Sequence, residues 1–148
     1  MNEFDRKQAL DVMAGASAEF LSKQYAVLAS AFPQAVPVRG PDIGTVMVRG
    51  KMGGGGALFN LGEASVTRAT VKLETGEIGH SVVLGRDEQK ARIVAHLDAL
   101  RQHPDWVAVI DETIVLPALS EKQAQENIRA EETEATRVDF FTVARGED

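Results

Sequence analysis

SVTRATVKLETGEIGHSVVL, residues 65–84, carries the clearest structural pattern in the chain. In its first half, apolar and polar residues alternate with the period of two typical of a strand with one buried face: Ala69, Val71 and Leu73 against Arg68, Thr70 and Lys72. Glu74–Glu77 is a turn sequence, and Ile78–Leu84 is expected to return as a second strand. The segment predicts an antiparallel hairpin.

The residues before this hairpin predict helices and then one more strand. Asp5–Ala14 and a second segment capped by Ser17 have helical spacing, so residues 1–32 are expected to form a helical hairpin. Residues 33–44 contain three prolines and predict an irregular connector. Thr45–Arg49 alternates again and is expected to be a strand.

The residues after the hairpin predict helices and a final strand. Asp87 is a helix cap, followed by a stripe of Ile93, Leu97 and Leu100. Residues 105–119 are rich in β-branched residues, but their helical spacing favours a helix disturbed at Pro117. Residues 120–135 favour a helix by propensity, and residues 136–145 favour a closing strand. The expected fold is a single α+β domain, residues 1–148, with its α+β body over residues 45–148.

Composition excludes several classes of function. The 148 residues carry a net charge of -6, which speaks against a nucleic-acid partner, and no apolar run is long enough to span a membrane. There is no cysteine, so thiolate-bound zinc, iron–sulfur clusters and thiol catalysis are excluded. A cytoplasmic protein without a cofactor of its own is expected.

A glycine-rich segment is the most unusual local feature. Gly53, Gly54, Gly55 and Gly56 follow Arg49 and Lys51, so their amide groups and these cations could contact an anion. The segment is not a P-loop, because the lysine precedes the glycines. A plain loop between two strands, or a loop that orders against a partner, explains the same residues.

Arginines and histidines provide the other candidates. Glu63, Arg49 and Arg68 could meet across paired strands, either to bind a phosphate or carboxylate or as a solvated ion pair. His80 shares its alternation face with apolar residues, which predicts a core or interface histidine. His96 and His103 lie seven residues apart, so no metal site is expected, and no pair of carboxylates is marked as catalytic.

Several ordered blocks resemble the PhnG family, a subunit of the bacterial phosphonate carbon–phosphorus lyase system. The resemblance covers the chain from about the second helix to its end. The blocks are Val46–Gly50, Phe59–Glu63 with Asn60, Val66–Arg68, Gly79-His80, Val83–Asp87 with Arg86, Leu97–Leu100, Ala135–Val143 and Arg145-Gly146. Gly55 and Thr70 depart from the family pattern.

The resemblance implies a role in organic phosphonate breakdown. The family works with the H, I and L subunits to make ribose 1-methylphosphonate 5-triphosphate from ATP and methylphosphonate, releasing adenine, and it forms a core assembly with the H, I and J subunits. We therefore expect an accessory, assembly-forming subunit that self-associates when isolated. In the alternative, the glycine-rich loop and its arginines bind the triphosphate or phosphonate directly. The contact candidates are Arg49, Lys51, Gly53, Gly54, Gly55, Gly56, Asn60, Glu63, Arg68, His80, Arg86 and Arg145.

Overall fold

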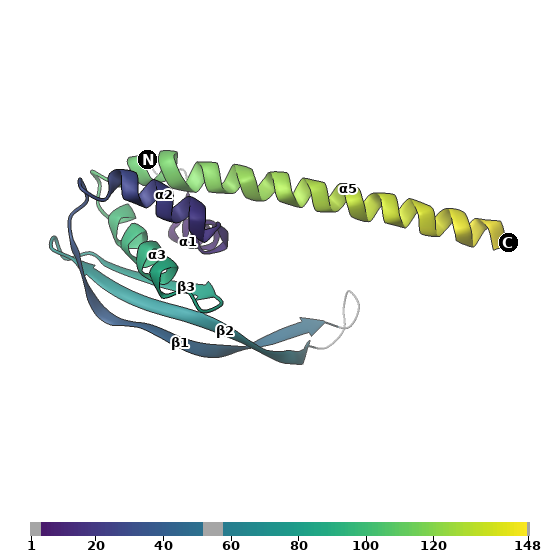
Figure 1. The fold of residues 1–148 in the computed structure, drawn as a ribbon, viewed down its shortest axis with the longest axis horizontal. Coiled ribbons are helices and arrows are strands. Elements are labelled where there is room, and N and C mark those ends of the chain that lie inside the picture. The colour runs from purple at the N-terminus through teal and green to yellow at the C-terminus, as the bar shows by residue number, and fades with distance from the viewer. Residues whose placement is uncertain (1–3, 52–57, 148) are drawn as a thin grey trace.

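A three-stranded sheet carries helices on one of its faces (Figure 1). The computed structural model describes the backbone of residues 4–51 and 58–147, and side chains over residues 4–50 and 59–132. The predicted α+β class, with two helices preceding the sheet and further helices after it, is confirmed. In chain order the elements are α1 (Arg6–Gly15), α2 (Ala18–Leu28), β1 (Ala35–Lys51), β2 (Leu58–Leu73), β3 (Ile78–Leu84), α3 (Glu88–Arg101), α4 (Val107–Ile110), the π-helix η1 (Asp111–Val115) and α5 (Leu116–Glu147).

The sheet is antiparallel, in the order β1-β2-β3. The amide of Gly76 donates a hydrogen bond to the carbonyl of Leu73 and closes the turn between β2 and β3, so the predicted hairpin is confirmed. The inner face of this hairpin is buried beneath α3 and includes Ala69, Val71, Leu73 and Val83. Burial of this apolar face, at about 25 cal/mol per Å², is the main driving force for docking the helices.

Strand β3 and helix α3 are in backbone contact at Gly79. A Cβ atom placed on Gly79 would lie 2.0 Å from the carbonyl oxygen of Ala95 and 2.6 Å from the amide nitrogen of Ala99. Ala95 and Ala99 are themselves fully buried. Small residues on both sides therefore let the helix lie directly on the strand, with no room for a larger side chain.

The N-terminal helices begin at well-formed caps and pack on α3. Asp5 and Gln8 form a capping box for α1, and the Ser17 hydroxyl accepts from the amide of Phe20 as predicted. Arg6 donates two hydrogen bonds to the buried carboxylate of Asp98, at 3.1 and 2.8 Å. The same carboxylate accepts the backbone amide of His80 at 2.9 Å. Asp98 thus links α1, α3 and β3.

The predicted connector over residues 33–44 is wrong for most of its length. Residues 35–44 belong to β1, which pairs with β2 from Ala35 to Lys51. The prolines are tolerated because β1 is an edge strand and its pairing shifts register between Pro37 and Asp42. The strand predicted over Thr45–Arg49 is confirmed as part of the same, longer element.

The C-terminal part differs from the prediction at its end. Residues 136–145, expected as a closing strand, are helical and belong to α5. The helix predicted over residues 105–119 is present from Val107, and its disturbance is the π-helix that precedes Pro117. Pro117 has no amide hydrogen to donate into an α-helical turn, which explains an irregular turn at this place. None of the described helices is long and apolar enough to cross a membrane.

A buried ion pair holds the start of this C-terminal part to α3. Arg101 donates two hydrogen bonds to Asp111, at 2.6 and 3.1 Å, and a third to the backbone carbonyl of Phe4. Both charged side chains are buried, at 4% and 7% exposure. The pair fixes the orientation of η1 and also holds the N-terminal segment before α1.

Substitution of Gly79 by alanine tests the close contact between β3 and α3. We expect Gly79→Ala to reduce the free energy of unfolding by about 3 kcal/mol or more, because the methyl group would meet backbone atoms. Gly44→Ala in β1 is the control, since a Cβ there meets nothing within 4 Å. Denaturant unfolding measures the free energy of unfolding of both variants. Equal values for Gly79→Ala and Gly44→Ala would contradict the close contact between β3 and α3.

Candidate functional site

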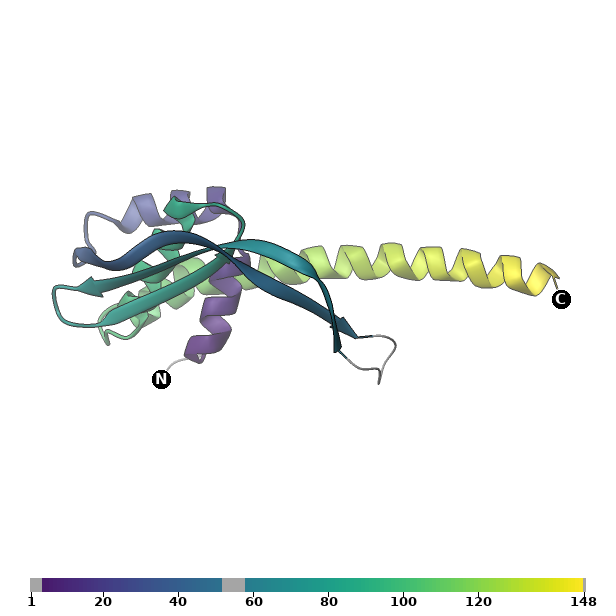
Figure 2. The same cartoon turned by 90° about the horizontal axis from the view of Figure 1, so that it is seen from below.

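One group of predicted residues lies on a projecting arm, which we define as residues 46–51 of β1 and 58–63 of β2. The arm extends past the helices that cover the rest of the sheet (Figures 1 and 2). Arg49 pairs in register with Asn60, and Met47 pairs with Glu63. No ion pair joins Arg49 to Glu63 within the described residues.

Arg68 does not join this group. Its register partner on β1 is Asp42, and it lies eight residues along β2 from Asn60. At roughly 3.3 Å per residue the separation is about 25 Å. The predicted meeting of Glu63, Arg49 and Arg68 is therefore wrong, because the register places Arg68 near the middle of the sheet.

The structure instead brings Arg68 and His80 together. Both line an open cleft of about 380 Å³ on the sheet face that carries no helices, which we call the outer face. Arg39 and Asp42 of β1 and Thr70 of β2 line the same cleft. The cross-strand pairs are Arg39 with Thr70, Thr70 with His80, and Asp42 with Arg68.

A β-bulge places Arg39 and Asp42 on the same face. Between the pairs Arg39–Thr70 and Asp42–Arg68, β1 advances three residues and β2 only two. The bulge includes Gly40 with φ 75°, where a Cβ would lie 2.7 Å from the carbonyl oxygen of Arg68. A glycine is therefore required both for the left-handed backbone and for the close approach.

His80 is exposed, so the core alternative of its prediction is wrong, while the alternative of an interface histidine stays a prediction. Its neighbours on the same face, Ile78, Val82 and Leu84, are also exposed, at 42%, 54% and 74%. The buried face of β3 carries Gly79, Ser81 and Val83 instead. The apolar side of this strand therefore points away from the core, and its register explains the error.

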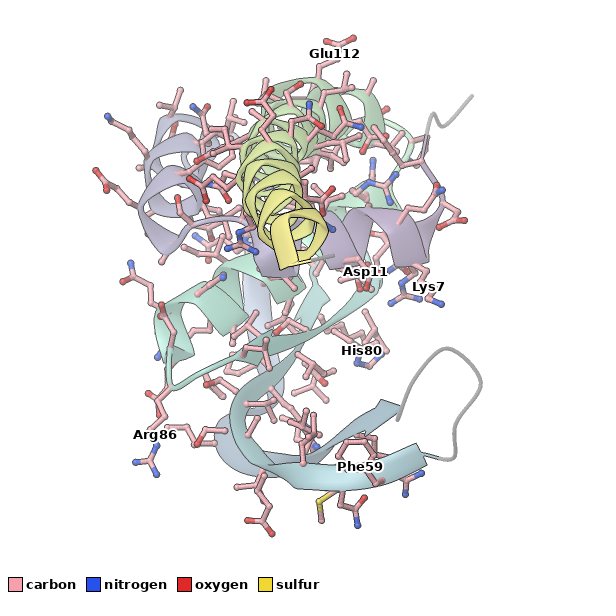
Figure 3. All side chains as sticks on the ribbon, turned by 90° about the vertical axis from the view of Figure 1, so that its right-hand side faces the viewer. Lys7, Asp11, Phe59, His80, Arg86 and Glu112 are labelled. Carbon is pink, nitrogen blue, oxygen red and sulfur yellow. The ribbon has the colours of Figure 1, made fainter. Side chains whose placement is uncertain are left out.

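The remaining predicted residues lie elsewhere. Arg86 is in the turn between β3 and α3, apart from His80 and from Phe59 on the arm (Figure 3). Arg145 belongs to the far part of α5, whose side chains are not described. Lys51 ends β1, and Gly53, Gly54, Gly55 and Gly56 lie outside the described residues.

Two cleft residues, Arg39 and Asp42, were not predicted as site residues because they fall in the segment expected to be irregular. The charged residues on both sides of Gly40-Pro41 were the available signal, since such a dipeptide can mark a bulge in an edge strand. No group of three or more acidic or histidine side chains that could hold a metal occurs in the described part of the chain.

A buried histidine lies on the other side of the sheet. His96 Nε2 lies 2.9 Å from the carbonyl oxygen of Pro33, and Nδ1 lies 2.7 Å from the hydroxyl of Tyr25. A neutral ring satisfies both contacts, with Nε2–H donating to the carbonyl and Nδ1 accepting from Tyr25. Burial lowers the pKa of His96 and raises that of Tyr25. This contact holds α2 and α3 together and is structural.

Comparison with known proteins identifies the family. The family model described as "Phosphonate metabolism protein PhnG" matches residues 4–146. The chain belongs to the PhnG family. It is 54% identical over 119 residues to the alpha-D-ribose 1-methylphosphonate 5-triphosphate synthase subunit PhnG of Rhizobium meliloti, covering 78% of this chain and 74% of that protein. The resemblance to PhnG found in the sequence is confirmed.

Because burial lowers the pKa of His96, we expect this PhnG-family chain to lose stability in acid. The folded pKa lies below the ordinary value of 6.5, so below pH 6.5 the unfolded state binds more protons. The free energy of unfolding should therefore fall as the pH drops from about 6.5 towards the folded pKa.

His96→Gln should be less stable at neutral pH but should lose much of this acid-dependent fall. His80→Gln is the matched control, because His80 is exposed and its ring hydrogen-bonds to Thr70 and not to Tyr25 or Pro33. Urea unfolding between pH 7.5 and pH 5 measures both. An unchanged profile in His96→Gln would contradict the assignment.

Proposed function

We propose that this chain is an accessory, assembly-forming subunit of a ribose 1-methylphosphonate 5-triphosphate synthase. The relative from Rhizobium meliloti is named as a subunit of that enzyme, which supports a role inside a complex. The partners we propose are the H, I, J and L subunits of the phosphonate lyase system. In this proposal the chain brings no cofactor of its own, and the base-displacing chemistry resides on a partner.

The observation that carries the proposal is the exposed apolar surface of the arm. Met47, Val48, Phe59 and Leu61 are exposed at 50%, 38%, 40% and 61%. Leu61 and Phe59 lie together over Gly50, at 3.1 and 3.5 Å from the position of a Cβ there. Exposed apolar side chains that lie together, as Phe59 and Leu61 do, are typical of a protein–protein interface.

The shape of the arm supports the same proposal. A two-stranded hairpin beyond the body of a domain is marginally stable in water unless something packs against it. None of the helices in the described residues covers the arm, and helix α5 also projects from the body (Figures 1 and 2). We propose that other synthase subunits pack on the arm, and that isolated copies associate through the same apolar surface.

The proposal predicts that the isolated protein has no turnover on ATP plus methylphosphonate. The reason is that the Rhizobium meliloti relative is named as one subunit of the synthase, and that no group of three or more acidic or histidine side chains that could hold a metal occurs among the described residues. Chromatographic detection of adenine checks this. Adenine release by the purified chain alone, abolished by one point substitution in it, would contradict an accessory role.

Substitutions on the arm test the docking surface. Phe59→Ser combined with Leu61→Ser should abolish co-purification with the other synthase subunits. The melting temperature should change little, because both side chains are already exposed.

Val27→Ser on α2 is the matched control, since Val27 is 72% exposed and lies away from the arm. It should co-purify like the wild type. Normal assembly of the double variant on the arm would contradict the proposed docking surface.

A further inference from the structure

The cleft on the outer face is a second feature, separate from the arm, and the docking role does not depend on it. It is lined by Arg39, Arg68, Thr70 and His80, together with Asp42. Its volume of about 380 Å³ lies at the lower end of the range for small-molecule sites, roughly 300–1,000 Å³.

The two arginines in the cleft, Arg39 and Arg68, have no ion-pair partner among the residues whose side chains are described. Asp42 stands opposite Arg68 in register, but no hydrogen bond or ion pair joins them. Two guanidinium groups and one carboxylate leave an excess of positive charge, on a chain whose net charge is -6.

The strand register puts the hydrogen-bond donors within reach of one another. Arg39 and His80 both pair with Thr70, from opposite sides. Arg68 is two residues from Thr70 on the same strand, so it is a diagonal neighbour of both, and long side chains span that distance. The bulge at Gly40, closed over the Arg68 carbonyl, fixes this arrangement in the backbone.

Thr70 and His80 add hydrogen-bonding groups to the cleft. The hydroxyl of Thr70 lies 3.1 Å from Nδ1 of His80. When the hydroxyl donates to Nδ1, the ring proton is on Nε2, which has no partner among the described residues and is left as a donor. The cleft thus offers two guanidinium forks and an imidazole N–H.

We infer that this cleft binds a phosphate-type oxyanion, such as a phosphoryl or phosphonate group of a small molecule. Guanidinium forks match phosphate oxygens in bidentate geometry. A tetrahedral oxyanion has acceptor oxygens in several directions, so donors from three strands can share it. A carboxylate has only two coplanar oxygens and satisfies fewer of these donors.

Calorimetric titration of the full chain with pyrophosphate, methylphosphonate and citrate tests the inference. Pyrophosphate or methylphosphonate should bind saturably, and Arg39→Gln and Arg68→Gln should each weaken that binding about tenfold, the effect of one lost charge-assisted contact. Asp42→Asn should strengthen it, because a repulsive carboxylate is removed. Arg129→Gln on α5, also an exposed arginine, is the control and should bind like the wild type.

Three results would overturn the inference. The first is no saturable binding of either phosphorus compound up to about 10 mM. The second is an equal loss of affinity in Arg129→Gln and Arg68→Gln, which would show attraction to net charge alone. The third is citrate binding as tightly as pyrophosphate through the same arginines. Circular dichroism of every variant confirms its fold, and the opposite signs expected for Asp42→Asn and Arg68→Gln separate a binding effect from a loss of structure.

Discussion

The contact between Gly79 and α3 is the constraint on which the architecture depends. With a glycine on the strand and Ala95 and Ala99 on the helix, the two backbones touch. This places α3 on the inner face of the sheet, where α1 and α2 pack against it in turn. Asp98 lies on α3 and accepts hydrogen bonds from Arg6 of α1 and from the amide of His80. All of this burial is on one side, so the outer face keeps its polar and apolar side chains free.

Local patterns predicted the parts of the fold that local physics determines. The alternation around Val71 gave the hairpin, and the caps at Ser17 and Asp87 gave two helix starts. The predictions of a connector over residues 33–44 and of a closing strand over residues 136–145 were wrong for different reasons. An edge strand accepts prolines and a bulge that a central strand would not, so residues 35–44 remain in β1. Residues 136–145 include several β-branched and aromatic residues, which favour a strand locally, but they continue an existing helix.

The candidate site was predictable only in part, because a site depends on register. Arg68 and His80 were each predicted as candidates, but only the strand alignment shows that Arg68 pairs with Val82 and His80 with Thr70. His80 was expected in the core or at an interface because it shares a face with apolar residues, and in the structure that face is the exposed one. Arg39 was not predicted because the bulge beside it depends on the close approach of Gly40 to the Arg68 carbonyl on the neighbouring strand. A pattern within one segment of sequence does not show such a contact. Family membership, by contrast, followed from ordered sequence blocks and did not need the fold.

The fold thus separates a buried side that holds the chain together from an outer face and an arm that are free to meet other molecules. Hydrogen–deuterium exchange on this chain, alone and in the assembled synthase, measures that separation most directly. Amides of residues 46–51 and 58–63 should exchange markedly more slowly in the complex, while those of α2 should be unchanged. Equal exchange of the arm in both states would contradict the central claim that this subunit assembles through it.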